Sequence, residues 1–212
     1  QIQLFFSDIE PLAASKVLVR LEKENLSIGE RVLAQELRLT VRGQDKIGII
    51  GPNGVGKSTL LAKFQQLLSG KREISLGFMP QDYQETLQLD LSPVEFLSQT
   101  GHKEELQKIQ SFLASLNFSY PEMHQQIHSL SGGQQGKLLL LNLVLRKPNF
   151  LLLDEPTRNF SPTSQPEIRK LFATYPGGLV TVSHDRRFLK EVCRSIYHLS
   201  ENGLEVVDLQ DL

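Results

Sequence analysis

The stretch that decides the fold is Gly51-Pro52-Asn53-Gly54-Val55-Gly56-Lys57-Ser58-Thr59. It matches the phosphate-loop pattern, in which Gly and four further residues precede Gly-Lys-Ser/Thr. Lys46–Ile50 before it predicts a short apolar strand, and Lys57–Ser69 after it predicts a helix. This order creates an anion site, because free backbone N–H groups and the helix dipole converge at the helix N-terminus. A glycine-rich turn that merely contains Lys-Ser is the alternative, and the flanking strand and helix argue against it.

The polar residues of this stretch indicate a nucleoside triphosphate bound with Mg²⁺. Lys57 is expected to reach the β- and γ-phosphates, and the Ser58 hydroxyl to bind Mg²⁺. The other ligands of the ion would be phosphate oxygens and water.

An acidic pair follows a second strand. Phe150–Leu153 is a continuous apolar run, typical of a buried parallel strand, and Asp154 and Glu155 follow it directly. Ligands of open α/β sheets bind at the carboxyl ends of the strands. We therefore expect Asp154 to bind Mg²⁺ and Glu155 to polarise the attacking water. Without the phosphate loop, the same pair would be interpreted as a solvated strand end.

The composition sets wider bounds. The chain has 212 residues, of which 40% are hydrophobic and 22% charged, and its net charge is −1. These values fit one globular α/β domain and give no footprint for nucleic acid or an anionic membrane. Cys193 is the only cysteine, so no internal disulfide can form, and a reducing, cytoplasmic location is expected. Its place on an apolar helical face favours a core position over a reactive thiol.

The remaining pattern predicts a mostly parallel sheet, an antiparallel pair of strands beside the nucleotide site and an inserted helical subdomain at about residues 92–145. Helix-start signals and a period of 3.6 residues mark the insertion. The other expected strands are Val17–Leu21, Leu37–Val41, Ile74–Met79, Gly178–Ser183, Ser195–Leu199 and Leu204–Val207, and the other expected helices are Gln165–Tyr175 and Arg186–Val192.

Three further stretches have residues suited to this chemistry. Leu130 is followed by Ser131-Gly132-Gly133-Gln134, which predicts a second helix N-terminus with anion-binding chemistry. Judged alone, the stretch favours an ordinary N-cap preceded by a flexible loop. Gln81 follows a strand and could reach the metal or the water. His184 also follows a strand, and in its neutral form could bind the γ-phosphate.

Taken in order, these motifs resemble the ATP-binding cassette (ABC) ATPase domain. The resemblance extends from Val17 to Val207, and Leu-Ser-Gly-Gly-Gln at 130–134 is the signature sequence specific to that superfamily. It implies ATP and Mg²⁺ as ligands, Glu155, His184 and Gln81 as catalytic residues, and head-to-tail pairing of two cassettes. The signature residues, Ser131 and Gly133 above all, would then bind the γ-phosphate held by a second cassette, in the same full-length chain or in a homodimer.

Two features resemble the ABC-F branch of that superfamily. Ser183-His184-Asp185-Arg186-Arg187-Phe188-Leu189 is similar to its pattern, and Lys137 after the signature also fits. ABC-F proteins are soluble, have two cassettes in one chain and act on ribosomes as translation factors or in antibiotic resistance. Because the sequence begins at Gln1 rather than Met, we expect one half of such a protein, the second cassette.

Two positions depart from the branch pattern. After Glu155-Pro156-Thr157 the branch usually continues Asn-His-Leu-Asp, whereas this chain has Arg158-Asn159-Phe160-Ser161, a variant similar to that of some resistance-type members. Ser161 in place of Asp puts communication across the paired cassettes in question. Ile28 lies near the position at which the family has an aromatic residue stacked on adenine, so weak base selectivity is expected.

Two other functions remain open at this stage. The chain could be the ATPase subunit of a membrane transporter whose helical subdomain docks on a permease, although Arg186–Leu189 favours ABC-F. It could also use ATP only as a pairing switch, which Ser161 supports and which Glu155 and His184 argue against.

Overall fold

A six-stranded sheet forms the centre of the molecule in the computed structural model, which describes residues 4–212. The strand order is β4-β5-β6-β3-β7-β8, and every neighbouring pair is parallel except β7 and β8. The strands span Lys46–Ile50 (β3), Leu76–Met79 (β4), Phe150–Asp154 (β5), Gly178–Val182 (β6), Ser195–Ser200 (β7) and Gly203–Val207 (β8). The mostly parallel α/β architecture predicted from the sequence is confirmed.

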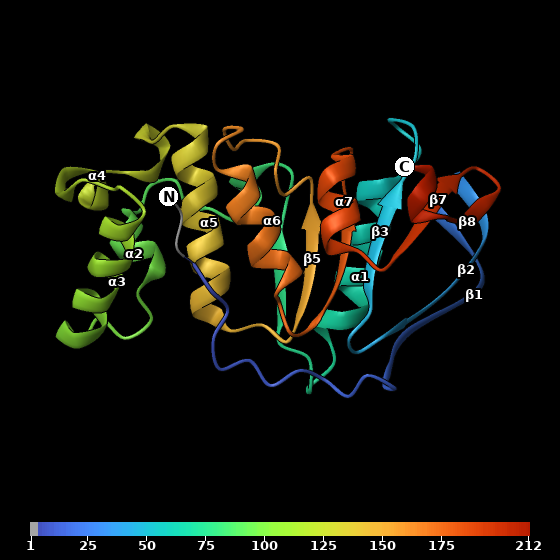
Figure 1. Cartoon of the computed structure of the whole chain (residues 1–212), viewed down its shortest axis with the longest axis horizontal. Coiled ribbons are helices and arrows are strands. Elements are labelled where there is room, and N and C mark those ends of the chain that lie inside the picture. The colour runs from blue at the N-terminus through green and yellow to red at the C-terminus, as the bar shows by residue number, and fades with distance from the viewer. Residues whose placement is uncertain (1–3) are drawn as a thin grey trace.

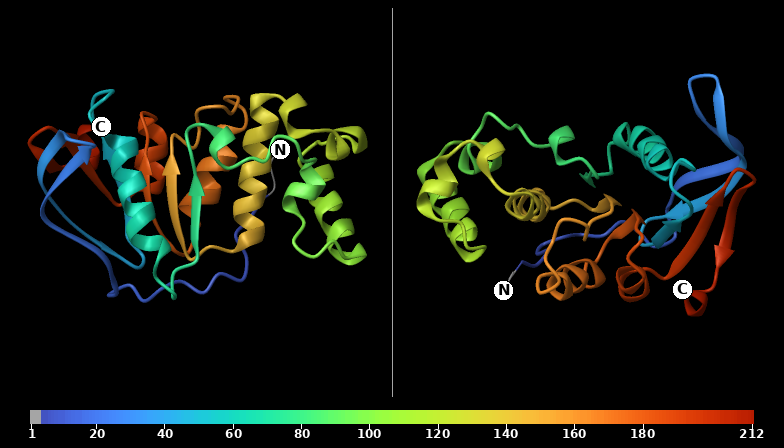
Figure 2. Two further views of the ribbon diagram at one scale, coloured as in Figure 1. Left: turned by 180° about the vertical axis from the view of Figure 1, so that it is seen from behind. Right: turned by 90° about the horizontal axis from the view of Figure 1, so that it is seen from above.

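The central strands are apolar on both faces because helices cover both (Figures 1 and 2). Every residue of β5 and of β6 is buried. Helix α1 (Lys57–Ser69) packs on one face, and α6 (Gln165–Ala173) and α7 (Arg186–Val192) pack on the other. Cys193, at the C-terminal end of α7, is 5% exposed, which confirms its core position. Burial raises the pKa of its thiol to about 12.

A group of short helices forms one end of the molecule (Figure 1). It comprises α2 (Pro93–Leu97), α3 (Lys103–Ser115) and α4 (Tyr120–His124), followed by the longer α5 (Gly132–Arg146), which contacts β4. Capping boxes begin α2, α4 and α5: in each, a Ser accepts a hydrogen bond from the backbone three residues on. Single 3₁₀ turns occur at Tyr83–Glu85, Ile127–Ser129 and Leu209–Asp211.

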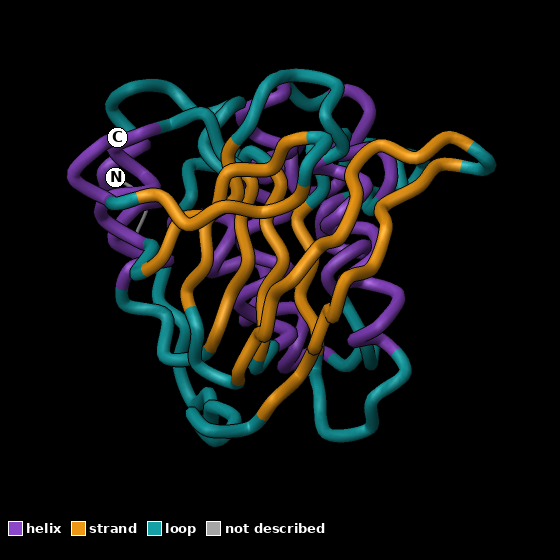
Figure 3. The backbone as a smooth tube through the Cα atoms, turned by 90° about the vertical axis from the view of Figure 1, so that its right-hand side faces the viewer, coloured by secondary structure: helices purple, strands orange, loops and turns teal. Residues whose placement is uncertain are grey.

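The other end is the antiparallel hairpin of β1 (Val17–Ile28) and β2 (Arg31–Arg42), which lies beside β7 and β8 (Figure 3). Both strands are longer than the sequence predicted, since only the first part of β1 and the last part of β2 alternate clearly. β4 is shorter than expected and begins at Leu76, because Ser75 instead bonds to Asn149 in a turn.

The chain before β1 runs along the edge of the sheet opposite the carboxyl ends of the parallel strands (Figure 1). Phe5 is exposed, but Phe6 packs edge-on against Tyr175 with ring centroids 4.8 Å apart. The carboxyl ends of the parallel strands β3, β4, β5 and β6 lie at the opposite end of the sheet from this N-terminal segment (Figure 1). The candidate site lies at those carboxyl ends.

Candidate active site

A cavity of about 960 Å³ opens at the carboxyl ends of the parallel strands. The phosphate loop, the loops after β4, β5 and β6, and the tip of the β1–β2 hairpin all contribute to its wall. Its lining includes the predicted residues Ile28, Asn53, Gly54, Gly56, Lys57, Ser58, Thr59, Gln81, Asp154, Glu155 and His184. Residues more than 150 positions apart in the chain are therefore brought to one place, as the motif order implied.

The phosphate loop joins β3 to α1 in a conformation that depends on glycine. Gly54 and Gly56 have φ values of +80° and +109°, which residues with a Cβ rarely adopt. A Cβ at Gly56 would also lie only 3.0 Å from the Leu33 side chain. The first turn of α1 has no side-chain cap at its N-cap residue, so its backbone N–H groups remain available to a bound anion.

Lys57 is folded back onto its own loop. Its Nζ donates hydrogen bonds to the carbonyl oxygens of Gly51 and Pro52, at 2.5 and 3.0 Å. Burial lowers the pKa of Lys57, and the nearby Glu155 and Asp154 oppose that shift. These bonds hold the ammonium at the mouth of the loop. Val55, the remaining loop residue, is half-buried against the sheet core and does not line the cavity.

Asp154 and Ser58 form the part of the site that fits a divalent cation. The Ser58 hydroxyl donates to Asp154 Oδ2 at 2.8 Å, whereas Asp154 Oδ1 is buried without a hydrogen-bond partner among residues 4–212. An orphaned carboxylate oxygen beside a hydroxyl is a suitable donor set for Mg²⁺. Within the described residues, no cluster of three His, Cys, Asp or Glu could hold a metal by itself, so phosphate oxygens would have to complete the coordination.

Glu155 is held in a strained position facing His184. Its φ is +49°, unusual for a residue other than glycine, and its backbone N–H donates to Val182 O at 2.8 Å. Glu155 Oε2 accepts from the His184 backbone N–H at 3.2 Å, and Oε1 lies 3.4 Å from His184 Nε2. Burial raises the pKa of Glu155, and the contacts with His184 oppose that shift. His184 therefore orients the carboxylate, and its predicted bond to the γ-phosphate stays a prediction.

Gln81 and Ile28 line the cavity at two other places. Gln81 is exposed on the loop after β4, and Ile28 is 58% exposed at the hairpin tip. Their contacts with metal, water and adenine stay predictions.

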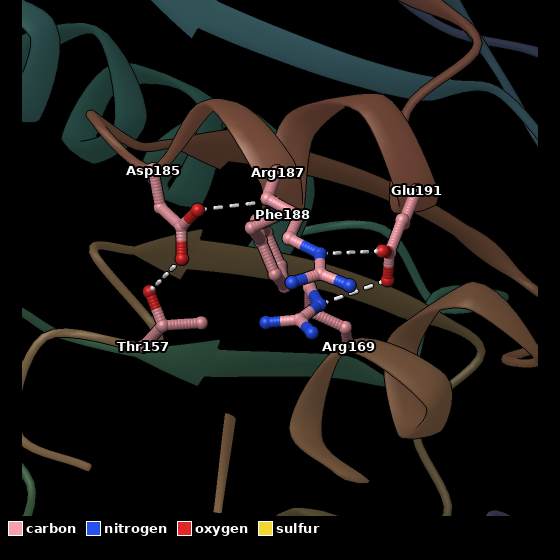
Figure 4. Close-up of polar contacts among 6 residues, drawn as sticks. All are labelled: Thr157, Arg169, Asp185, Arg187, Phe188 and Glu191. Atoms are coloured by element: carbon pink, nitrogen blue, oxygen red, sulfur yellow. Dashed lines mark hydrogen bonds and ion pairs between the residues drawn. The ribbon is translucent and has the colours of Figure 1, made fainter. Parts of the chain in front are cut away.

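Several wall residues were missed as site residues in the sequence: Arg31, Leu33, Thr157, Arg158, Gln165, Val182 and Asp185. Thr157 and Asp185 fasten the loops after β5 and β6 together, as Figure 4 shows. Thr157 Oγ1 donates to Asp185 Oδ2 at 3.0 Å, and Asp185 Oδ1 caps α7 by accepting from the Phe188 N–H. The Ser-His-Asp stretch signalled Asp185, but no sequence signal marks its partner.

The signature residues Ser131, Gly132, Gly133 and Gln134 lie at the N-terminus of α5 and do not line this cavity. Ser131 Oγ accepts from the Gln134 N–H at 3.2 Å, and Gln134 Oε1 accepts from the Ser131 N–H at 3.1 Å. The N-cap predicted from the sequence is confirmed. Figure 1 shows that the N-terminus of α5 faces the same edge of the molecule as the phosphate loop, with α6 and α7 between them.

The loop after β5 links the cavity to α5. Its Phe160 is buried, and a Cβ added at Gly136 of α5 would lie 2.9 Å from the Phe160 ring. Ser161, in place of the Asp expected for the branch, bonds through its hydroxyl to Thr163 and Ser164 within the same loop.

The comparisons with known proteins agree with this geometry. Residues 34–158 match the ABC transporter family, to which this chain belongs, and the fold and site define it as an ATP-binding cassette, the ATPase domain of that family. The chain is 30% identical to Probable ATP-binding protein YheS of Escherichia coli (strain K12) over 96% of its own length and 33% of the relative. It is 27% identical to ABC transporter F family member 2 of Arabidopsis thaliana, over 85% of this chain and 28% of that protein.

Solved structures show the same fold. The ATP-binding cassette MJ0796, in a dimeric post-hydrolysis state bound to ADP and Pi, superposes with a TM-score of 0.74 at 19% identity and covers 91% of this chain and 98% of its own. The chain spans about a third of the length of the curated relatives it matches. Of the helices between residues 4 and 212, none has both the length and the apolarity needed to cross a membrane.

Proposed function

We propose that this chain is one cassette of a two-cassette ABC-F ATPase that binds Mg²⁺-ATP, pairs head to tail with the other cassette and acts on the ribosome. The observation that supports pairing most strongly is the separation of two halves of a site on one edge of the molecule. The phosphate loop, Asp154 and Glu155 share a cavity, whereas Ser131 and Gly133 lie outside it.

The residues of the cavity suit hydrolysis of a terminal phosphate. The uncapped N-terminus of α1 and the Lys57 ammonium would bind the phosphates. Mg²⁺, held by Ser58 and Asp154, would neutralise charge on the phosphate oxygens. Glu155 would accept a proton from the attacking water, and its bonds to His184 keep the carboxylate oriented for that task.

The signature residues would complete the site of the partner. In this chain Ser131 and Gln134 exchange hydrogen bonds at the start of α5, where Ser131 and Gly132 are exposed. A phosphate held by a facing cassette would meet those groups and the positive end of the helix dipole. A cassette alone would therefore hydrolyse ATP slowly.

Two findings support the ABC-F branch. The Ser183–Leu189 stretch has structural reasons for its pattern: Asp185 caps α7, and Phe188 and Leu189 are buried beneath it. A relative is also named ABC transporter F family member 2. The Arg158–Ser161 variant favours an antibiotic-resistance member of the branch.

The ribosomal role is tested with the full-length protein that contains this cassette. With Glu155→Gln and Mg²⁺-ATP, we expect it to sediment with ribosomes in a sucrose gradient and to remain at the top with ADP. Recovery with a membrane permease, and none with ribosomes, would instead establish the transporter function.

A further inference from the structure

Arg158, on the loop after β5, presents a cationic group to the cavity. Three other arginines of the fold are engaged: Arg169 and Arg187 pair with Glu191, and Arg146 donates to the Leu97 carbonyl. The Arg158 side chain is exposed, and across residues 4–212 its guanidinium has no ion pair and no hydrogen bond. It is a cation in the wall of the cavity with no protein anion bound to it.

The backbone that presents Arg158 is well fixed. The Arg158 N–H donates to the Glu155 carbonyl at 3.2 Å and closes a tight turn directly after the catalytic carboxylate. Thr157, one residue earlier, is bonded to Asp185, and Phe160, two residues later, is buried against α5. Because both sides of the turn are anchored, the backbone holds Arg158 in the cavity wall close to Glu155.

That space is the phosphate end of the cavity. Asp154 experiences the positive charges of both Lys57 and Arg158, each of which lowers its pKa against the larger effect of burial. Ile28 and Arg31 at the hairpin tip also line the cavity. Arg158 is thus close to the acidic pair and belongs to the same end as the phosphate loop.

From this placement we propose that Arg158 binds the terminal phosphate of the nucleoside triphosphate held in this chain's own cavity. The cavity wall holds three carboxylates, Asp154, Glu155 and Asp185, and three cationic side chains, Lys57, Arg31 and Arg158. The positive charge of Arg158 beside the acidic pair lowers the repulsion that a triphosphate would meet there. The planar guanidinium can donate two parallel N–H bonds to phosphate oxygens, which a lysine cannot do.

The terminal phosphate is absent from the diphosphate product, so the contact would discriminate between the two nucleotides. Arg158 would hold the triphosphate until hydrolysis and lose its partner when phosphate leaves. This inference rests on the proposed function, because it assumes that the cavity binds Mg²⁺-ATP.

The test is calorimetry with a non-hydrolysable ATP analogue and with ADP, both with Mg²⁺. Arg158→Gln should weaken binding of the analogue about tenfold, the loss of one charge-assisted contact, and change ADP binding less than about twofold. Arg158→Lys should recover part of the loss, since it keeps the charge but not the paired donors. Arg20→Gln, an exposed arginine of β1 outside this cavity, is the matched control and should change neither affinity.

Unchanged analogue binding by Arg158→Gln, or an equal loss for both nucleotides, would overturn the inference while leaving the proposed function intact. Failure of the wild-type chain to bind either nucleotide would instead overturn the proposed function. Thermal unfolding is the control for folding. If Arg158→Gln unfolds at the same temperature as the wild type, loss of folding is excluded as the cause of weaker binding.

Discussion

The two glycine-rich helix starts of this molecule, at α1 and α5, face the same edge but differ in how their N-termini are satisfied. Gly56 precedes α1 and provides no side-chain cap, whereas Ser131 and Gln134 form a capping box on α5. The N-terminus of α1 also has Lys57 and the acidic pair of β5 around it, in a shared cavity. Among the described residues, the start of α5 has no such neighbours lining a cavity with it, so the groups suited to phosphate binding surround α1 and not α5.

The comparison teaches that a helix N-terminus becomes a binding site through its surroundings. Both helices have a dipole and free N–H groups at their N-termini. Only α1 of the two has Lys57, Asp154 and Glu155 beside it in a cavity. We therefore propose that the signature segment acts when a second cassette brings these groups to it.

The largest effect is expected when the water-activating group is removed. Glu155→Gln keeps the shape of the side chain but removes the base, and should lower ATP turnover of the paired cassettes at least about a hundredfold. Steady-state phosphate release measures it. Glu205→Gln, an exposed residue of β8, is the control and should turn over ATP normally. Turnover of Glu155→Gln close to that of the control would show that another group activates the water.

A smaller effect is expected at the phosphate loop. Lys57→Ala removes a charge-assisted phosphate contact of roughly 1.5–3 kcal/mol and should reduce ATP affinity at least about tenfold by calorimetry. Lys63→Ala is the control on the same helix, because Lys63 pairs with Glu24 at 2.8 Å outside the cavity. If both variants bind ATP like the wild type, the site is wrongly assigned.

The contact between α5 and the loop after β5 should show the smallest effect. Gly136→Ala adds a Cβ at 2.9 Å from the Phe160 ring, an overpacking that costs about 1–3 kcal/mol. Gly132→Ala, in the first turn of the same helix, meets no atom within 4 Å and is the control. Both gain the helix propensity of alanine, so urea unfolding should find Gly136→Ala less stable than Gly132→Ala by about that amount. Equal stabilities would mean that Phe160 moves aside without cost.

The sequence predicted the parts of the fold whose local pattern is uninterrupted. β3, α1 and α7 match their expected bounds, because a phosphate loop and an Asp185 N-cap mark where they begin or end. β5 was recognised from its continuous apolar run. The β1–β2 hairpin was underestimated, because Lys23 and Glu24 interrupt its alternation at positions where the strand pairing is irregular.

The candidate site was predicted as far as its motifs extend. Asp154 ends β5, and Glu155, Gln81 and His184 follow strands, and parallel strands bring such positions to one edge. Arg31 and Arg158 were not predicted as wall residues, because neither belongs to a motif and their approach depends on how a hairpin and a turn fold over the sheet. The Thr157–Asp185 bond is likewise a product of two neighbouring loops.

The central claim, that the phosphate loop and signature of one chain serve two different sites, is tested most directly by light scattering. Glu155→Gln with Mg²⁺-ATP should form a dimer, or a complex with the other cassette when it is supplied, because unhydrolysed ATP stabilises the paired state by mass action. Glu155→Gln combined with Ser131→Arg should stay monomeric, since the bulky cation would occupy the place of the partner's phosphate. The claim would be contradicted if both variants had the same mass with ATP when the other cassette is also supplied. This holds whether that mass is the monomer's or the dimer's.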